Sequence, residues 1–142
     1  MLVHLLYASR VSTSVTDEFT EAILQQSRLN NPRLGITGLL CQGGDVYLQV
    51  LEGGRGPVNA LYNTILRDPR HQQVMLLHYR EISERRFTGW TMGHVKLDKM
   101  NPSLLLKYSE KAVLDPFSVS GEASMALLDE LIATAQIIGR AG

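Results

Sequence analysis

The sequence predicts an α+β sandwich, a fold in which helices pack on the faces of a β-sheet. Two observations lead to this fold class. Some short segments are β-branched and aromatic with alternating side chains, whereas in other segments apolar residues recur at helical spacing. Over residues 2–95 these segments follow one another as strand, helix, strand, strand, helix, strand and strand.

The first strand is predicted at Leu2–Tyr7, and because both of its faces are apolar we expect both to be covered. Ser14 or Thr16 can cap the helix that follows, whose first turn is acidic. Its apolar residues keep helical spacing up to about Leu29. Pro32 disfavours helical backbone at the residue before it, so we expect the helix to end there.

A hairpin comes next, with apolar strands at 36–41 and 46–51 around the turn residues Gly43-Gly44-Asp45. A glycine-rich break then leads to a second helix, which begins near Pro57 and carries an apolar stripe. Asp68-Pro69 closes this helix. The hairpin therefore lies between two helices along the chain.

The last two strands are predicted at 74–82 and 90–95, and alternation in the second one places Trp90, Met92 and His94 on one face. The whole order resembles a ferredoxin-like sandwich with one extra strand, a five-stranded mixed sheet with two helices on one face. Helical stretches in the C-terminal part, or a second copy of the protein, would cover the other face.

Length and composition limit the function classes. The chain has 142 residues, enough for one domain, and we expect a core domain at 1–96 and a helical extension at 97–142. A formal net charge of zero argues against nucleic-acid binding, and no apolar run is long enough to predict a membrane span. Cys41 is the only cysteine and the histidines lack metal-ligand spacing. We therefore expect a cytoplasmic protein without a metal site.

Gln49 is unusual for its position in the second hairpin strand. Its neighbours Leu48 and Val50 are apolar, so its carboxamide should be buried, and a buried amide without a partner costs about 1–3 kcal/mol. If Gln49 points toward the helices, Tyr7 can do so too, and a phenol beside an amide suits a bound heteroaromatic ring. The alternative is a buried polar network that only fixes the strand register.

Several segments together resemble the BLUF family, the flavin-binding sensor domains for blue light. They are YASR, NNPRLGITGLL followed by VYLQVLEG, a DPRH turn, and RRFTGWTM, and they cover residues 1–96 in the family's order. The resemblance implies a flavin, usually FAD and sometimes FMN, between the two helices on one side of the sheet.

The resemblance also implies roles for individual residues. Tyr7 would be the photochemical donor of an electron and a proton. Gln49 would bridge this tyrosine to the N5 and O4 edge of the ring. Asn31 would bond the ring's carbonyl and imide edge, and Ser27 would lie near the tyrosine and the tryptophan.

Other positions would support the ring. Trp90 and Met92 match the family's pair on the fifth strand, which exchanges positions beside the glutamine. Helix side chains such as Ile23 would supply the apolar slot that a flavin ring needs. Rotation or tautomerisation of Gln49 would redirect hydrogen bonds without a change in packed volume.

Cations are expected near the mouth of this site, because flavin nucleotides carry phosphate. Arg28, Arg67, Arg70 and His71 lie at the predicted helix ends. Some family members have a phosphate-binding arginine within the second helix, where this sequence has Thr64.

The function predicted from the resemblance is a stand-alone photoreceptor and not an enzyme. About 46 residues follow the core domain, too few for a cyclase or phosphodiesterase domain. Light would then act through the C-terminal helices, through a homo-oligomer such as a dimer or larger ring, or through a separate effector protein. The alternatives are a small acylphosphatase-like hydrolase, with Arg10 and Asn31 as its candidate set, and a ligand-free interaction module on the same fold.

Overall fold

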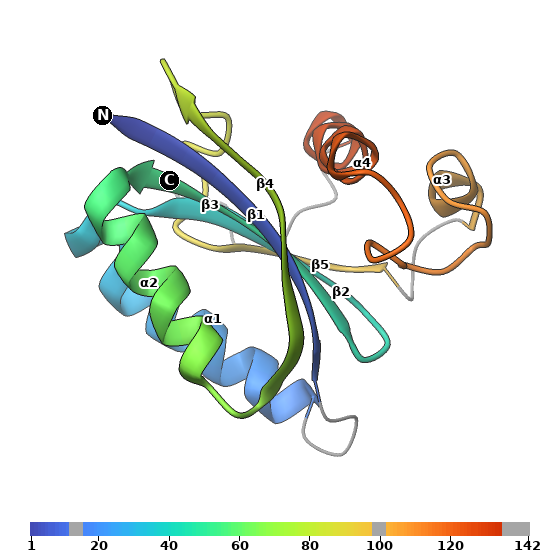
Figure 1. Cartoon of the computed structure of the whole chain (residues 1–142), viewed down its shortest axis with the longest axis horizontal. Coiled ribbons are helices and arrows are strands. Elements are labelled where there is room, and N and C mark those ends of the chain that lie inside the picture. The colour runs from blue at the N-terminus through green and yellow to red at the C-terminus, as the bar shows by residue number, and fades with distance from the viewer. Residues whose placement is uncertain (12–15, 98–101, 135–142) are drawn as a thin grey trace.

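The computed structural model describes residues 1–11, 16–97 and 102–134. Helices α1 and α2 lie on one face of a five-stranded sheet, and α4 lies on the other (Figure 1). The predicted α+β sandwich is therefore confirmed. The elements in chain order are β1 (Leu2–Val11), α1 (Thr16–Leu34), β2 (Thr37–Gly43), β3 (Val46–Gly54), α2 (Arg55–Arg67), β4 (His71–Ile82), β5 (Gly93–Lys96), α3 (Pro102–Leu106) and α4 (Gly121–Ala133).

The strand order across the sheet is β4-β1-β3-β2-β5. Strand β1 pairs antiparallel with β3 and β4, β2 pairs antiparallel with β3, and β5 pairs parallel with β2. The sheet is thus mixed, as predicted. Strands β1 and β3 lie in its centre, which explains why both of their faces carry apolar side chains.

Alternation along β1 and β3 divides their side chains between two cores. Leu5 and Leu51 belong to the core under α1 and α2, whereas Leu6 and Val50 belong to the core under α4. We call the two sides of the sheet the α1/α2 face and the α4 face. Leu128 of α4 is fully buried against the second of these, so the expectation that a C-terminal helix covers it is met.

Helix α1 does not end before Pro32, as the sequence suggested, but continues to Leu34. Pro32 lies in the last turn, where its missing N–H removes only one helical bond. The helix ends at Gly35 instead, whose φ of 69° is easy for glycine. The Ile36 N–H bonds the Asn31 carbonyl at 3.0 Å and the Gly35 N–H bonds the Pro32 carbonyl, a Schellman motif. Asn31 is therefore fixed in the final turn of α1.

The limits of β4 and β5 also differ from the prediction. Strand β4 starts at His71, because a register shift against β1 and the positive φ of Gln73 let the chain remain paired through an irregular stretch. Strand β5 starts only at Gly93. Trp90 and Met92 therefore do not share a strand face: Trp90 packs in the α4-face core and Met92 in the α1/α2-face core.

Candidate functional site

Tyr7 and Gln49 form the centre of the candidate site. They are directly paired in register on the neighbouring strands β1 and β3, so their side chains emerge on the same face. The Tyr7 hydroxyl donates a hydrogen bond to Oε1 of Gln49. Both side chains are buried, with 1% and 3% of their surface exposed. The structure thus brings together the phenol and the amide that the strand alternation suggested.

The other end of the Gln49 amide is also engaged. Its Nε2 donates to the Sδ atom of Met92 at 3.3 Å, and Met92 is fully buried. The acceptor and donor ends of one amide therefore hold a phenol on one side and a thioether on the other. Because a half-turn of this amide would break both bonds, its two orientations are distinct states of the site.

Asn31 enters the site from the last turn of α1. Its Nδ2 atom donates to the carbonyl oxygen of Thr91 at 2.7 Å, and only 2% of the residue is exposed. This bond joins α1 to the segment that precedes β5. Asn31 thereby places a second amide near Gln49.

A cavity of about 320 Å³ lies among these groups, lined by Tyr7, Gln49 and Asn31 together with residues of α1 and α2. This volume falls within the range of about 300–1,000 Å³ that is common for small-molecule sites. Ile23 and Ser27 of α1 line it, as do Leu61 and Ile65 of α2. The cavity thus combines aliphatic walls with a few placed polar groups.

A family model described as "BLUF: Sensors of blue-light using FAD" matches residues 2–93. The chain belongs to the BLUF family. Among curated proteins, it is 33% identical over 92 residues to a photoactivated adenylate cyclase subunit beta of Euglena longa, covering 64% of this chain and 11% of that protein. It is 30% identical over 87 residues to the blue light- and temperature-regulated antirepressor BluF of Escherichia coli, covering 61% of this chain and 22% of that protein. The matched region is thus a small part of these longer relatives.

Solved BLUF structures resemble this chain over nearly its whole length. The dark-state structure of BlrB has 33% identity and a TM-score of 0.79, with 94% of this chain and 96% of BlrB covered. The photo-activated state of BlsA has 28% identity and a TM-score of 0.82, with 93% and 95% covered. Klebsiella pneumoniae BlrP1 with FMN and cyclic diGMP has 29% identity and a TM-score of 0.70, with 95% of this chain and 35% of that one covered.

The residues of this BLUF chain fit a flavin ring. The two amides of Asn31 and Gln49 offer hydrogen-bond donors and acceptors inside the cavity, and the aliphatic residues Ile23, Leu61 and Ile65 offer apolar contact for a planar ring. Burial raises the pKa of the Tyr7 phenol well above its usual value, so the hydroxyl keeps its proton at neutral pH.

Two of the four cations proposed for the mouth of the cavity line it. Arg70 does so, with its guanidinium in an ion pair to Asp68 at 2.7 Å and stacked 4.2 Å from the centre of the Phe19 ring. His71 lines the cavity as well. Arg28 and Arg67 are exposed and are not among the residues that line the cavity. Their contact with a flavin phosphate stays a prediction.

Arg33 takes a place that the sequence reasoning missed. It lines the cavity and its Nη2 atom donates to Oδ1 of Asn30 at 2.9 Å. The sequence reasoning ended α1 before Pro32, whereas Arg33 lies in the extra turn of this helix. Thr64 lines the cavity too, but its hydroxyl donates to the Ala60 carbonyl within α2. Among the described residues, Arg33 and Arg70 are the arginines that line the cavity.

His71 supplies no positive charge at neutral pH. Burial lowers its pKa to about 4, the nearby Asp68 opposing this shift only in part. Its Nδ1 atom lies 2.8 Å from the Ser9 hydroxyl, and its ring meets the Phe19 ring edge-on at 5.0 Å between centroids. It is therefore a neutral, packed member of the wall.

Ser27 and Trp90 lie on opposite sides of the sheet. Ser27 lines the cavity with Tyr7, whereas Trp90 packs near Phe87 at 6.4 Å between ring centroids, in the α4-face core. The structure therefore does not bring the serine and the tryptophan together. Met92, and not Trp90, is the neighbour of Gln49.

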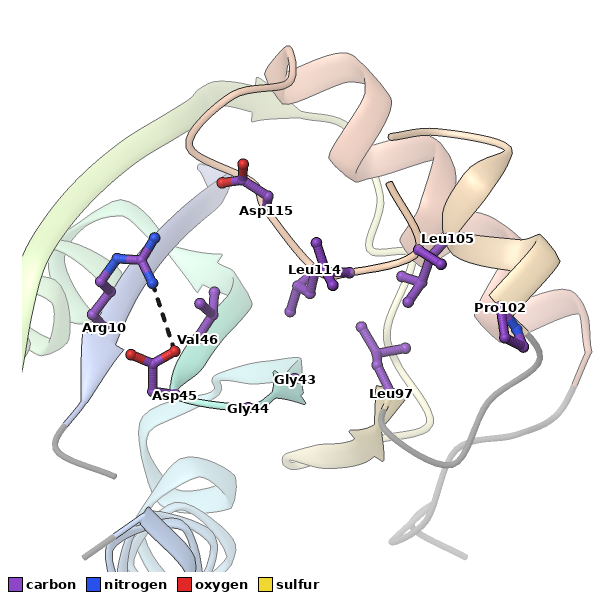
Figure 2. Close-up of a pocket in the computed structure, with 12 residues that line it drawn as sticks. Arg10, Gly43, Gly44, Asp45, Val46, Leu97, Pro102, Leu105, Leu114 and Asp115 are labelled. Atoms are coloured by element: carbon purple, nitrogen blue, oxygen red, sulfur yellow. Dashed lines mark ion pairs between the residues drawn. The ribbon is translucent and has the colours of Figure 1, made fainter. Parts of the chain in front are cut away.

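A second cavity, of about 500 Å³, lies beyond the β2–β3 turn, between this turn and the chain around α3 (Figure 2). Arg10 lines it and makes an ion pair with Asp45 at 3.6 Å. Asn31 lines the other cavity, so the pair proposed for an acylphosphatase-like hydrolase is divided between two places. This separation disfavours the hydrolase alternative.

In residues 1–11, 16–97 and 102–134, no helix is long and apolar enough to cross a membrane. Within the same ranges, no group of three His, Cys, Asp or Glu side chains is arranged to hold a metal ion. Cys41 is buried in the α4-face core, where burial raises the pKa of its thiol.

Proposed function

We propose that this chain is a blue-light photoreceptor that binds flavin and converts light into a rearrangement of the hydrogen bonds of Gln49. The observation that carries this proposal is the chain of contacts from Tyr7 through Gln49 to Met92 beside a cavity of suitable size. Membership of the BLUF family supports it, as do relatives whose names describe light activation.

The flavin would lie between α1 and α2, held by Asn31 and Gln49 at its polar edge and by Ile23, Leu61 and Ile65 along its plane. When bound, a flavin absorbs blue light and accepts an electron. Arg33 and Arg70 would meet the phosphates. We propose FAD as the physiological flavin, with FMN as the alternative, because the family model names FAD and one similar structure contains FMN.

Tyr7 and Gln49 would carry the response. We assign to the dark state the arrangement in which the protonated phenol donates to Oε1 of Gln49 and Nε2 donates to Met92. After light absorption Tyr7 would give an electron toward the ring and its proton toward the amide, and both would return once Gln49 had rotated or tautomerised. Each exchanged hydrogen bond is worth about 0.5–1.5 kcal/mol.

This magnitude decides what kind of signal is produced. Two or three such bonds can shift a balanced equilibrium about tenfold or more, but a change from 1:99 to 99:1 takes about 5.5 kcal/mol. Light would therefore redistribute the protein between states that already exist in the dark.

The output would be a change in protein–protein contacts and not catalysis by this chain. We assign residues 1–96 to the light-sensing domain and 97–142 to the output extension, since β5 ends at Lys96 and α4 closes the α4 face. The proposed partners are further copies of this chain, in a dimer or larger ring, and a separate effector protein.

The test is spectroscopic. The protein is purified, loaded in the dark with FAD or FMN, and illuminated with blue light. The proposal predicts a yellow protein whose flavin absorption moves slightly to the red and returns in the dark. A protein that takes up flavin but shows no reversible shift would contradict it, as would one that takes up neither flavin.

A further inference from the structure

The segment of residues 83–92, which joins β4 to β5, contacts both faces of the sheet. It runs from one edge strand to the other and so passes the ends of β1, β3 and β2. Phe87 and Trp90 pack in the α4-face core, whereas Met92 packs in the α1/α2-face core beside Gln49. A shift of this segment would therefore change the packing on both faces of the sheet.

Glu52 holds the start of this segment. It lies on β3, three residues after Gln49, and its side chain lies on the α4 face with only 1% of its surface exposed. Oε1 accepts the backbone N–H of Arg86 at 2.8 Å and of Phe87 at 2.9 Å. Oε2 lies 3.2 Å from Nδ1 of His4. A buried carboxylate with three polar partners is a strong and directional anchor.

The far end of the segment is held by bonds of its own to distant parts of the chain. Gly38 donates its N–H to the Trp90 carbonyl at 3.0 Å, and Asn31 reaches the Thr91 carbonyl. The bond from Gln49 ends on the sulfur of Met92, and a thioether is a weak acceptor. Met92 is therefore placed beside the amide by the bonds to residues 90 and 91, together with the anchor at residues 86–87, more than by the bond to its sulfur.

The anchored residues also reach α4. The Arg86 side chain forms an ion pair with Asp129 of α4, although its backbone N–H is bound to Glu52. Phe87 packs in the same core as Leu128. Residues 86 and 87 thus connect β3 to the helix that covers the opposite face from the cavity.

We propose that Glu52 is a positioning residue for the light response: its carboxylate fixes residues 86–87 and thereby sets both Met92 against Gln49 and Arg86 against Asp129. This inference rests on the proposed function of the Tyr7–Gln49 site. Two side chains of β3, on opposite faces, contact the two ends of one segment: Glu52 bonds residues 86–87, and Gln49 contacts Met92. When the hydrogen bonds of Gln49 change, the Met92 end of the segment can then move while Glu52 keeps residues 86–87 in place.

The test compares Glu52→Ala with Glu52→Gln in the flavin-loaded full chain. Glutamine keeps an oxygen for the two N–H groups, whereas alanine leaves them without an acceptor. With the anchored arrangement assigned to the dark state, as in the proposed function, Glu52→Ala should retain flavin and the red shift but recover in the dark several-fold more slowly. Glu52→Gln should recover within about twofold of wild type, on the same hydrogen-bond argument.

Hydrogen exchange supplies a readout that does not depend on light. The amides of Arg86 and Phe87 should exchange faster in Glu52→Ala than in wild type or Glu52→Gln, since their protection comes from the carboxylate. Glu81→Gln is the matched control, because this carboxylate on β4 is exposed and pairs only with the surface residue Arg55 among the described contacts. It should change neither readout.

The outcomes separate the two proposals. Suppose that Glu52→Ala recovers in the dark at the wild-type rate although the amides of Arg86 and Phe87 exchange faster. This result would overturn the role of Glu52 and leave the proposed function intact. Slow recovery in both variants with unchanged exchange would also overturn the role of Glu52, because the effect would then not pass through residues 86–87. If Glu52→Ala does not fold, Glu52→Asp, which withdraws the acceptors by one methylene, must show the same slower recovery and faster exchange. A flavin-loaded wild type without a light response would refute the proposed function itself.

Discussion

The two faces of the sheet are made from alternate residues of the same strands, yet they are built for different tasks. On the α4 face, Leu6, Leu48 and Val50 meet Leu128 and Leu131 in a core of largely aliphatic side chains. On the α1/α2 face the same strands present a phenol and an amide to a cavity of about 320 Å³. The α4 face thus stabilises the fold by close packing, whereas the α1/α2 face is less densely packed and leaves space for a ligand.

The strongest way to test this comparison is to remove a hydroxyl from the α1/α2 face. Tyr7→Phe should bind flavin and lose the red shift completely, because Gln49 loses its phenolic donor. Tyr47→Phe is the matched control: Tyr47 is buried on the same face but its hydroxyl is paired with Thr20. It should keep the shift and lose only about 0.5–1.5 kcal/mol of stability. Light–dark difference spectra check both, and a normal shift in Tyr7→Phe would contradict the assignment.

The second variant affects the α4 face. Leu128→Ala removes a fully buried side chain and should lower the free energy of unfolding by about 2–5 kcal/mol. Its red shift, measured below the unfolding transition, should remain. Denaturant unfolding gives the stability, and Leu106→Ala, on an exposed residue of α3, serves as the control with little change. Loss of the red shift in folded Leu128→Ala would show that the two faces are not separable in this way.

A smaller effect is expected at Asn31, on the helix side of the cavity. Asn31→Ala removes the bond to Thr91 and the proposed polar contact to the ring. If binding weakens by about 1 kcal/mol, flavin should dissociate roughly fivefold more readily. Asn63→Ala, on the exposed side of α2, should leave the affinity unchanged. Titration with flavin measures both constants. Equal affinity in Asn31→Ala and wild type would give Asn31 a structural role only.

The smallest expected effect is the pH dependence due to His71. Burial holds its folded-state pKa at about 4, below the ordinary value of 6.5, so the unfolded chain takes up a proton first as the pH falls. The contribution of His71 to stability is therefore complete above pH 6.5 and decreases from there toward pH 4. Burial also lowers the pKa values of His78 and His94, in the same direction, so only a comparison isolates His71. His71→Gln should show a shallower decrease, and an identical slope would contradict this explanation.

The sequence predicted the parts of the site that depend on alternation and order. Tyr7 and Gln49 lie on adjacent strands, so a correct assignment of strand faces was enough to place them together. The glycine at position 35 showed its role only in the structure, because Pro32 suggested an earlier helix end. Arg33 was missed as a lining residue for the same reason, since it lies in that extra turn of α1.

Trp90 and Met92 show a different limit of sequence reasoning. Alternation assumes a regular strand, but β5 is only 4 residues long and begins after both of them. Contacts far along the chain, to Glu52, Gly38 and Asn31, determine how the preceding segment turns. No local pattern in the sequence reports such contacts.

The central claim is that the Gln49 amide, which bonds Tyr7 at one end and Met92 at the other, changes its hydrogen bonds in response to light. It is tested most directly by the light–dark difference spectrum of flavin-loaded Gln49→Leu beside wild type. The account predicts a reversible red shift in wild type and none in the variant, although both bind flavin. A red shift of normal size in Gln49→Leu would contradict the account.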